Sequence, residues 1–223
     1  MRTLVSYLMK PNDPVWPGNP PLTLRVAESI DRGDVANTFN IELHNHRGTH
    51  MDAPWHFHNK GKKIAELPFD SFFYARPQIL DIPKKSCEMI TAQDLKPYHD
   101  KIAGCDLLMI RTGYGPTRFS DPKAYAEDGP GFGSDAAKYL MDNFPGLKAL
   151  ALDMISLASY RNSEDGAISH RTMLGAYHAR PGILIIEDVR MAGLPTNLTA
   201  AAAIPLFIEG IDSSPVTMWV EHE

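Results

Sequence analysis

Residues 41–58 read IELHNHRGTHMDAPWHFH, and this stretch holds five of the nine histidines of the 223-residue chain. A strand here would project His46, His50 and Asp52 from one face, because strand side chains repeat every two residues. A helix would still bring His46 and His50 together, since they are four residues apart. The glycine and the proline within the stretch disfavour a long regular element. We therefore expect a strand end that runs into a tight loop, with two imidazoles and a carboxylate converging.

This set of side chains matches the ligands of a catalytic zinc or manganese site, in which three protein ligands leave positions open for water. The alternative is a histidine-rich segment that is solvated or packed in a core and holds no metal. Three candidate ligands and a further histidine after Pro54 favour the metal site. His56 is best placed as general acid and base, because it can take a proton from water that the metal activates and hand it to the leaving group.

The overall composition indicates an ordinary globular chain and excludes several classes of function. The net charge of −5 argues against a nucleic-acid or anionic-membrane partner. Cys87 and Cys105 form no zinc-finger or disulfide pattern, and no G-x-S-x-G elbow or cysteine signature supports a covalent nucleophile. The N-terminus lacks a signal-peptide pattern, and the most apolar stretch, residues 198–208, has about half the length of a membrane span. We expect one domain over residues 1–223, located in the cytoplasm.

Short apolar runs between turn residues predict an α/β domain with a mixed β-sheet and few helices. The alternation at residues 39–43 predicts a strand with one buried face. Four apolar runs predict strands buried on both faces, at residues 106–111, 147–152, 183–187 and 204–208. Residues 215–220 are expected to form an edge strand, because a proline is tolerated at its first position. Helix-start signals lie at residues 91–94 and 134–135, and the second of these predicts a helix over residues 136–143.

A proline-rich segment precedes the histidines. Residues 11–21 contain five prolines and one glycine, so we expect an extended loop. Such a loop either links two parts of the chain or walls a pocket with Trp16, whose large amphipathic ring suits that role.

Polar residues outside the central stretch receive simpler interpretations. His44 is expected to lie beside His46, and His58 at the surface or in a pocket wall. His178 could reach the site, but a position in a surface loop is favoured. Asp153 and Ser156 follow a predicted buried strand and either form a turn or face a pocket. The turn is favoured, stabilised by hydrogen bonds from side chain to backbone.

Residues 46–57, HRGTHMDAPWHF, resemble the H-x-G-T-H-x-D-x-P-x-H-F signature of the cyclase family of metal-dependent hydrolases. That family includes bacterial kynurenine formamidase and isatin hydrolase. Similar segments occur at residues 15–18, 110–113, 130–131 and 152–156, so the resemblance extends over most of the chain. It implies the swivelling β/β/α-like fold of the cyclases. It also favours the interpretation in which Trp16 lines the wall of a substrate pocket.

The resemblance also implies roles for individual residues. His46, His50 and Asp52 would hold a first metal ion, and Asp52 could bridge to a second. His170 and Glu187 would complete the binuclear site, and His56 would be the general acid and base. Seventeen positions separate His170 from Glu187, more than is usual in the family, so we expect an altered pocket next to them. The expected cofactor is one or two zinc ions, with manganese as the alternative.

These residues predict a hydrolase that cleaves a small amide with water activated by metal, and arylformamidase activity is the first expectation. A hydrolase of cyclic amides, imides, lactams or isatin-type rings is the alternative within the enzyme class. A metal-binding module without catalysis is the alternative outside it, and His56 argues against that module because such a protein has no need of it. The resemblance further implies a homo-oligomer, either a dimer or a tetramer.

Overall fold

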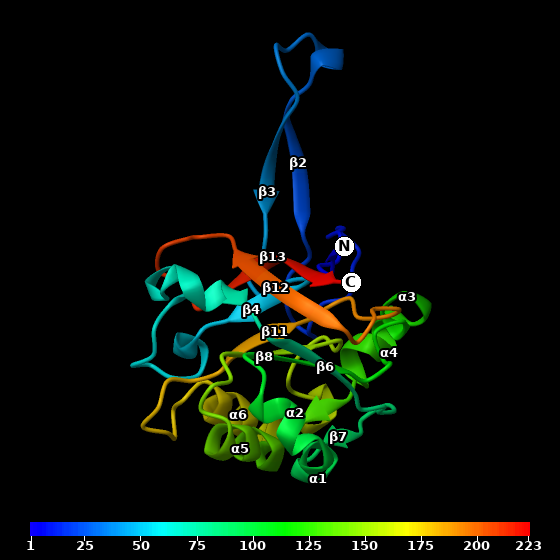
Figure 1. Cartoon of the computed structure of the whole chain (residues 1–223). Coiled ribbons are helices and arrows are strands. Elements are labelled where there is room, and N and C mark those ends of the chain that lie inside the picture. The colour runs from blue at the N-terminus through cyan, green and yellow to red at the C-terminus, as the bar shows by residue number, and fades with distance from the viewer.

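A computed structural model describes all residues 1–223 and shows a single α/β domain built on one large mixed sheet (Figure 1). The order along the sheet is β5-β12-β13-β4-β11-β10-β8-β6, and β1 pairs with β13. The strands are β1 (Arg2–Leu4), β4 (His50–Asp52), β5 (Phe73–Tyr74), β6 (Pro77–Asp81), β8 (Leu107–Arg111), β10 (Ala149–Leu152), β11 (Leu184–Glu187), β12 (Leu198–Pro205) and β13 (Ser213–His222). A small parallel pair consists of β7 (Met89–Ile90) and β9 (Gly131–Phe132).

The sheet combines a parallel and an antiparallel half. Strands β6, β8, β10 and β11 pair in parallel, whereas β4 pairs antiparallel with both β11 and β13. Leu107, Leu150 and Ile186 are fully buried, because apolar side chains cover both faces of the parallel half. The predicted mixed sheet is therefore confirmed, and so are the strands predicted within residues 106–111, 147–152 and 183–187.

The helices are short and gather mostly on one side of the sheet (Figure 1). They are α1 (Ala92–Leu95), α2 (His99–Ala103), α3 (Thr117–Ser120), α4 (Pro122–Glu127), α5 (Ser134–Asn143) and α6 (Ser163–Met173), with 3-10 turns at η1 (Ile30–Arg32), η2 (Pro54–His56), η3 (Ile64–Glu66), η4 (Phe69–Phe72), η5 (Lys96–Tyr98) and η6 (Tyr160–Asn162). The predicted helix over residues 136–143 lies within α5, which packs on α6. None of the helices is long and apolar enough to cross a membrane.

Two predicted strands need correction. The strand expected at residues 204–208 instead runs over Leu198–Pro205, and Leu206, Phe207 and Ile208 are exposed. The pairing with β13 ends with Pro205 opposite Val216, because the chain then turns through residues 206–212 and returns as β13. The edge strand expected at residues 215–220 is in fact central, because β13 pairs with β12, β4 and β1.

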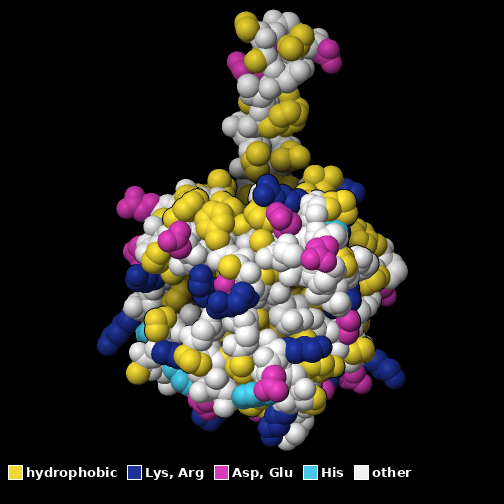
Figure 2. All heavy atoms as spheres, in the orientation of Figure 1, with side chains coloured by type: hydrophobic (Ala, Val, Ile, Leu, Met, Phe, Trp, Pro, Cys, Tyr) yellow, Lys and Arg dark blue, Asp and Glu magenta, His cyan; other side chains and the backbone are white.

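A two-stranded hairpin, which we call the arm, projects from the body of the molecule (Figure 1). It consists of β2 (Thr23–Glu28) and β3 (Thr38–Glu42). The expectation of a buried face for residues 39–43 is wrong, since every residue of β3 is exposed and pairs only with β2. Apolar side chains therefore lie open along the arm (Figure 2), among them Leu24, Val26, Phe39 and Ile41.

The proline-rich segment is an extended loop, as predicted, and it is held against the body rather than linking two domains. The buried Arg47 side chain donates hydrogen bonds of 2.9 Å to the carbonyls of both Lys10 and Pro11. Asp13, within the same loop, pairs at 3.2 Å with buried Arg118. Two buried guanidinium groups thus fix the loop that carries Trp16.

Candidate metal centre and active site

Strand β4 and the turn before it bring the predicted ligands together. The backbone reverses at Gly48, whose φ of 60° lies in the region that favours glycine. The chain then enters β4, where the fully buried Met51 points into the core and His50 and Asp52 share the opposite face. His46 reaches the same place from the turn rather than from the strand. The expected tight loop is present, but its expected order is wrong, because the loop at residues 43–49 precedes the strand that carries His50 and Asp52.

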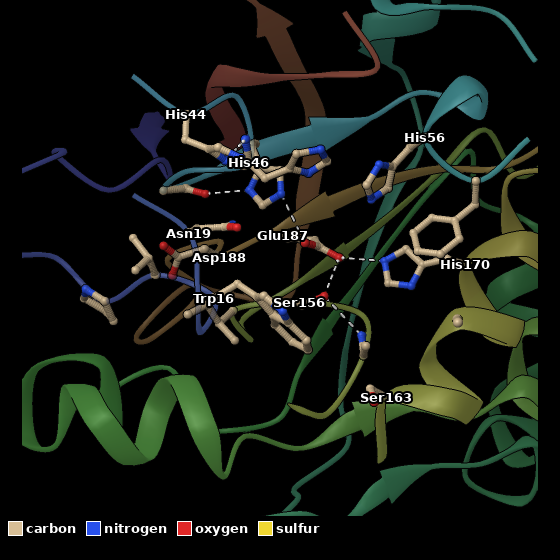
Figure 3. A pocket seen from close by; sticks show the side chains of 18 residues that line it. Trp16, Asn19, His44, His46, His56, Ser156, Ser163, His170, Glu187 and Asp188 are labelled. Atoms are coloured by element: carbon tan, nitrogen blue, oxygen red, sulfur yellow. Dashed lines mark hydrogen bonds and ion pairs between the residues drawn. The ribbon is translucent and has the colours of Figure 1, made fainter. Parts of the chain in front are cut away.

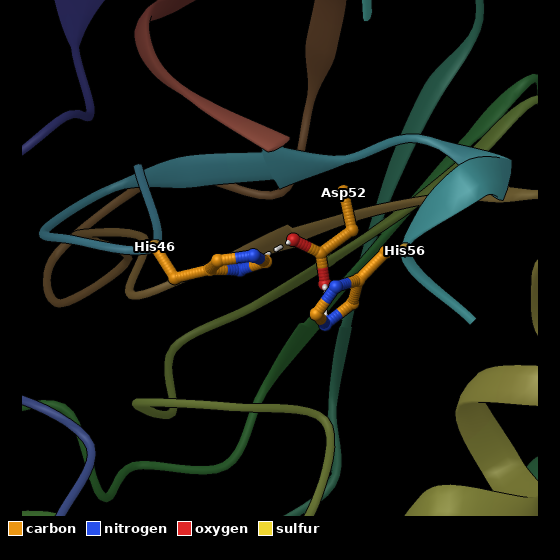
Figure 4. Close-up of side chains that lie close together, drawn as sticks. All are labelled: His46, Asp52 and His56. Atoms are coloured by element: carbon orange, nitrogen blue, oxygen red, sulfur yellow. Dashed lines mark ion pairs between the residues drawn. The ribbon is translucent and has the colours of Figure 1, made fainter. Parts of the chain in front are cut away.

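Asp52 lies at the centre of the cluster, and four imidazoles surround it. Its Oδ1 is 3.1 Å from His46 Nδ1 and 3.7 Å from His50 Nε2. Its Oδ2 is 3.9 Å from both His56 Nε2 and His170 Nε2. Figure 4 shows the Asp52 carboxylate between His46 and His56.

Glu187, at the end of β11, closes the other side of the cluster. It lies opposite His50 in the register of β4 and β11. Its Oε2 is 3.1 Å from His50 Nε2, and its Oε1 is 3.4 Å from His170 Nε2. His170 comes from α6. This helix packs closely against the loop at Ala158, because Gly166 has no Cβ that would collide with Ala158. All six residues predicted for the metal and for proton transfer are therefore in one place.

The donor set fits a divalent metal. His50 Nε2 and both carboxylate oxygens of Asp52 are buried and have no hydrogen-bond partner. Buried polar atoms are nearly always hydrogen-bonded, so three such atoms in one cluster call for a ligand. Two groups, His46–Asp52–His56 and His50–Asp52–Glu187, each have ligand atoms within 4.8 Å of one another. Asp52 belongs to both groups, which fits its predicted place between two metal ions.

Hydrogen bonds on the far side of each ring orient the histidines. His50 Nδ1 is 2.8 Å from the Gly48 carbonyl, and His170 Nδ1 is 2.8 Å from the Gly166 carbonyl. A carbonyl only accepts, so each Nδ1 carries the proton and donates it, and each Nε2 presents its lone pair to the cluster. Such partners fix the orientation of imidazoles that bind metals.

The electrostatics of the cluster favour ionised carboxylates. Burial and the charge of Asp52 raise the pKa of Glu187, but the adjacent imidazoles of His170 and His50 outweigh both and lower the pKa to about 2. Burial also raises the pKa of Asp52, yet the surrounding imidazoles hold it well below its usual range. For His46, burial lowers the pKa, but Asp52 and Asp212 outweigh it and raise the pKa to about 10. Two buried negative charges require positive charge beside them, which protonated imidazoles such as His46 supply and which a bound metal ion would supply in their place.

A cavity of about 460 Å³ opens onto the cluster. Figure 3 shows His46 and His56 on one side of it and Trp16 and Ser163 on the other. Trp16 lines the cavity, as predicted, and packs edge-on against Tyr160 with ring centroids 5.5 Å apart. Phe57 stacks on His170 at 4.6 Å and adds a second aromatic wall.

Of the histidines outside the motif, His44 lies where it is expected, whereas His58 and His178 are half-buried rather than exposed. His44 lines the cavity beside His46, with ring centroids 5.8 Å apart. His58 does not line the cavity, and His178 lies 3.9 Å from Asp142 of α5, away from the cluster.

The turn interpretation holds for Asp153 and is incomplete for Ser156. The Asp153 carboxylate accepts hydrogen bonds from Thr112 N (2.8 Å) and Gly113 N (3.1 Å), which shapes the loop after β8. Ser156 Oγ accepts from Ala158 N in a turn, but it also lines the cavity and donates to Glu187 at 3.2 Å.

Asp212 is the site residue that the sequence did not reveal. It lies in the turn between β12 and β13, 156 positions after His56, and its Oδ2 accepts hydrogen bonds from His56 Nδ1 at 2.6 Å and His46 Nε2 at 2.9 Å. Burial raises its pKa, but these two imidazoles outweigh that effect and hold it well below its usual range. A single aspartate in a turn carries no local pattern that would have identified it.

Comparisons with known proteins agree with this geometry. The Cyclase family model matches residues 4–159, which contain His46, His50, Asp52 and His56, while His170 and Glu187 follow the matched region. The kynurenine formamidase of Bacillus cereus is 28% identical over 215 residues, covering 95% of this chain and 93% of that protein. An uncharacterised protein of Haemophilus influenzae is 38% identical over 116 residues, covering 52% of this chain and 82% of its own length.

Solved structures share the fold over the whole chain. Isatin hydrolase A from Ralstonia solanacearum superimposes with a TM-score of 0.80 at 17% sequence identity, covering 100% of this chain and 92% of the other. A structure described as a potential metal-dependent hydrolase with cyclase activity has a TM-score of 0.75 at 21% identity, covering 99% and 96%. The family model matches more than half of this chain, and the signature residues gather around one cluster. This chain therefore belongs to the cyclase family.

Proposed function

We propose that this protein is a metal-dependent hydrolase of a small amide, with arylformamidase activity on N-formylkynurenine-type substrates as the first candidate. The observation that carries the proposal is the position of His56 at the edge of a complete set of buried ligand atoms. Its Nδ1 is held by Asp212 at 2.6 Å, and its Nε2 faces the cluster, 3.9 Å from Asp52 Oδ2. The kynurenine formamidases among the relatives support this choice of substrate.

The metal would be held by the residues that lie around Asp52. His46, His50 and Asp52 would bind one ion, and Asp52, His170 and Glu187 would bind a second. When bound, zinc or manganese supplies Lewis-acid polarisation of a carbonyl and makes water more acidic. The histidine and carboxylate ligands suit either metal.

The residues of the chain itself carry the proton and position the substrate. His56 Nε2 accepts a proton from the attacking water and returns it to the amide nitrogen as the C–N bond breaks. Trp16 and Phe57 give the cavity two aromatic walls, which suit an aryl ring next to the scissile amide.

A second candidate is the hydrolysis of a cyclic amide of the isatin type. The isatin hydrolases among the structural neighbours favour it. The two candidates are separated by assaying the zinc- and manganese-loaded protein on N-formylkynurenine, isatin and simple cyclic imides side by side. A higher kcat/KM on N-formylkynurenine supports the first candidate, a higher value on a ring supports the second, and turnover of none of them rejects the hydrolase proposal for these substrates.

Removal of the metal is expected to abolish turnover. Treatment with EDTA followed by desalting should leave less than about one hundredth of the activity, since the metal contributes several kcal/mol of transition-state stabilisation. Adding back zinc or manganese should restore it, as measured by activity against metal equivalents per chain. Protein that melts at a lower temperature after EDTA, but never turns over any amide, would instead support a metal-binding module without catalysis.

Replacing Trp16 is expected to weaken substrate binding more than the chemical step. Trp16→Ala removes an aromatic wall that lies across the cavity from the metal cluster, so KM for an aryl substrate should rise about 10-fold with kcat within about threefold. Exposed Trp55, which does not line the cavity, provides the matched control in Trp55→Ala. An unchanged KM in Trp16→Ala would remove Trp16 from the substrate site.

The oligomeric state, the partners and the location of the protein are also proposals. We propose a homo-oligomer, a dimer or a tetramer, and the exposed apolar side chains of the arm support a contact between chains (Figure 2). The substrate is a small molecule, and we propose no nucleic-acid or membrane partner and a cytoplasmic location.

A further inference from the structure

We propose that Asp212 is a positioning residue that fixes the ring orientation and the proton position of His46 and His56 together, and so links metal binding to proton transfer. This inference rests on the proposed hydrolase function. One carboxylate oxygen, Oδ2, serves both rings, at 2.9 Å from His46 Nε2 and 2.6 Å from His56 Nδ1. The two ring centroids lie only 4.2 Å apart, so one oxygen can reach both.

The fold holds Asp212 firmly beside β4. Ser213, the next residue, lies opposite Asp52 in the register of β13 and β4. The Asp212 carbonyl accepts a hydrogen bond of 2.9 Å from Ala53 N. Its second carboxylate oxygen, Oδ1, accepts one of 2.6 Å from Asn45 Nδ2. Asp212 is thus tied through its carboxylate to the segment before the ligand strand and through its carbonyl to the segment after it, which restricts where the carboxylate can lie.

An ionised carboxylate only accepts hydrogen bonds, so both ring nitrogens that face Asp212 must carry their protons. With a metal bound, His46 would present the lone pair of Nδ1, the nitrogen that lies 3.1 Å from Asp52 Oδ1. His56 has its lone pair on Nε2, which faces the cluster. The opposite tautomers would aim a proton at the metal position from His46 and leave His56 unable to accept a proton there. Asp212 therefore selects the forms that a ligand and a general base require.

Asp212 does not fit the role of a further metal ligand. Oδ2 already accepts two hydrogen bonds from the imidazoles, and Oδ1 accepts the one from Asn45. By contrast, neither oxygen of Asp52 has a hydrogen-bond partner. This difference separates the carboxylate that would bind metal from the one that orients its neighbours.

Kinetics of three variants test the inference. Asp212→Ala removes the acceptor, and kcat is expected to fall about 100-fold with KM within about twofold. Asp212→Asn keeps an oxygen that can accept but loses the charge, so an intermediate loss of about 10-fold is expected. Glu209→Ala changes an exposed carboxylate in the same turn and should match the parent protein. Equal kcat in Asp212→Ala and Glu209→Ala would overturn the inference.

A spectroscopic measurement separates this inference from the proposed function. In zinc-loaded protein with ¹⁵N-labelled histidine rings, the ¹H–¹⁵N spectrum at alkaline pH should show the His56 proton on Nδ1. In Asp212→Ala, a measurable fraction of the molecules should carry the His56 proton on Nε2 instead. Should the alanine variant not fold, Asp212→Asn serves instead, because its amide can turn an N–H toward the ring. An unchanged His56 tautomer overturns the inference, whereas a parent protein that hydrolyses none of the amides rejects the proposed function alone.

Discussion

His56→Ala is expected to lower kcat by about 10²–10⁴-fold, the usual contribution of a general acid and base, while the protein keeps its full complement of metal. The reason lies in the geometry, since the imidazole is oriented from behind by Asp212 and its free nitrogen faces the cluster at 3.9 Å from Asp52. Turnover of N-formylkynurenine and metal analysis on the same preparation measure the two outcomes together.

His58→Ala is the matched control for this variant. It removes an imidazole only two positions away that does not line the cavity, so both activity and metal content should equal those of the parent. Because His56 also belongs to one of the groups that could hold a metal, metal content decides its role. A loss of one metal equivalent in His56→Ala would make His56 a ligand, and surviving turnover would remove it from catalysis.

The spacing of the site residues along the chain decides which of them the sequence predicts. His46, His50, Asp52 and His56 lie within one short motif, where strand periodicity and ligand chemistry act over neighbouring residues. His170 and Glu187 lack such local support, and only the resemblance to a family assigns them to the site. The structure brings both to the cluster through α6 and β11, elements whose docking depends on tertiary packing.

The misplaced elements share a physical cause. Residues 39–43 alternate like a half-buried strand, but burial depends on whether a further layer covers them, and in the arm none does. Similarly, the sequence around Pro215 is compatible with an edge strand, and only the pairing of β13 with three other strands shows that it is central. No local pattern identifies Asp212 for the same reason, because its partners His46 and His56 come from a distant segment of the chain. Local patterns indicate an element's type, whereas its neighbours are set by the whole fold.

Asp52→Asn is expected to remove the metal centre while changing almost no volume. Asp52 is fully buried and lies within 3.9 Å of a nitrogen of four different histidines, and both its oxygens lack hydrogen-bond partners. The amide loses the negative charge and replaces one oxygen with an N–H₂ group that cannot bind a cation. We expect metal affinity to fall at least about 100-fold and turnover at stoichiometric metal to vanish, as measured by chelator competition and by assay.

The stability of the two proteins in the presence of metal provides an independent readout of Asp52→Asn. At a zinc concentration of about 100 times the parent's Kd, binding should stabilise the parent by about 2.7 kcal/mol, whereas a 100-fold weaker variant gains only about 0.4 kcal/mol. For a chain of this size the parent's melting temperature should therefore rise by about 5–10 °C and the variant's by about 1 °C.

Asp153→Asn supplies the control, because Asp153 is also a buried aspartate but accepts its hydrogen bonds from Thr112 and Gly113 in a loop that holds no metal ligand. That variant should lose stability in the metal-free state and still show the full zinc-induced rise. If both variants lost the rise equally, the effect would reflect general damage to the core. If Asp52→Asn kept the rise, zinc would bind without the carboxylate at the centre of the cluster, and the assignment of ligands around Asp52 would be wrong.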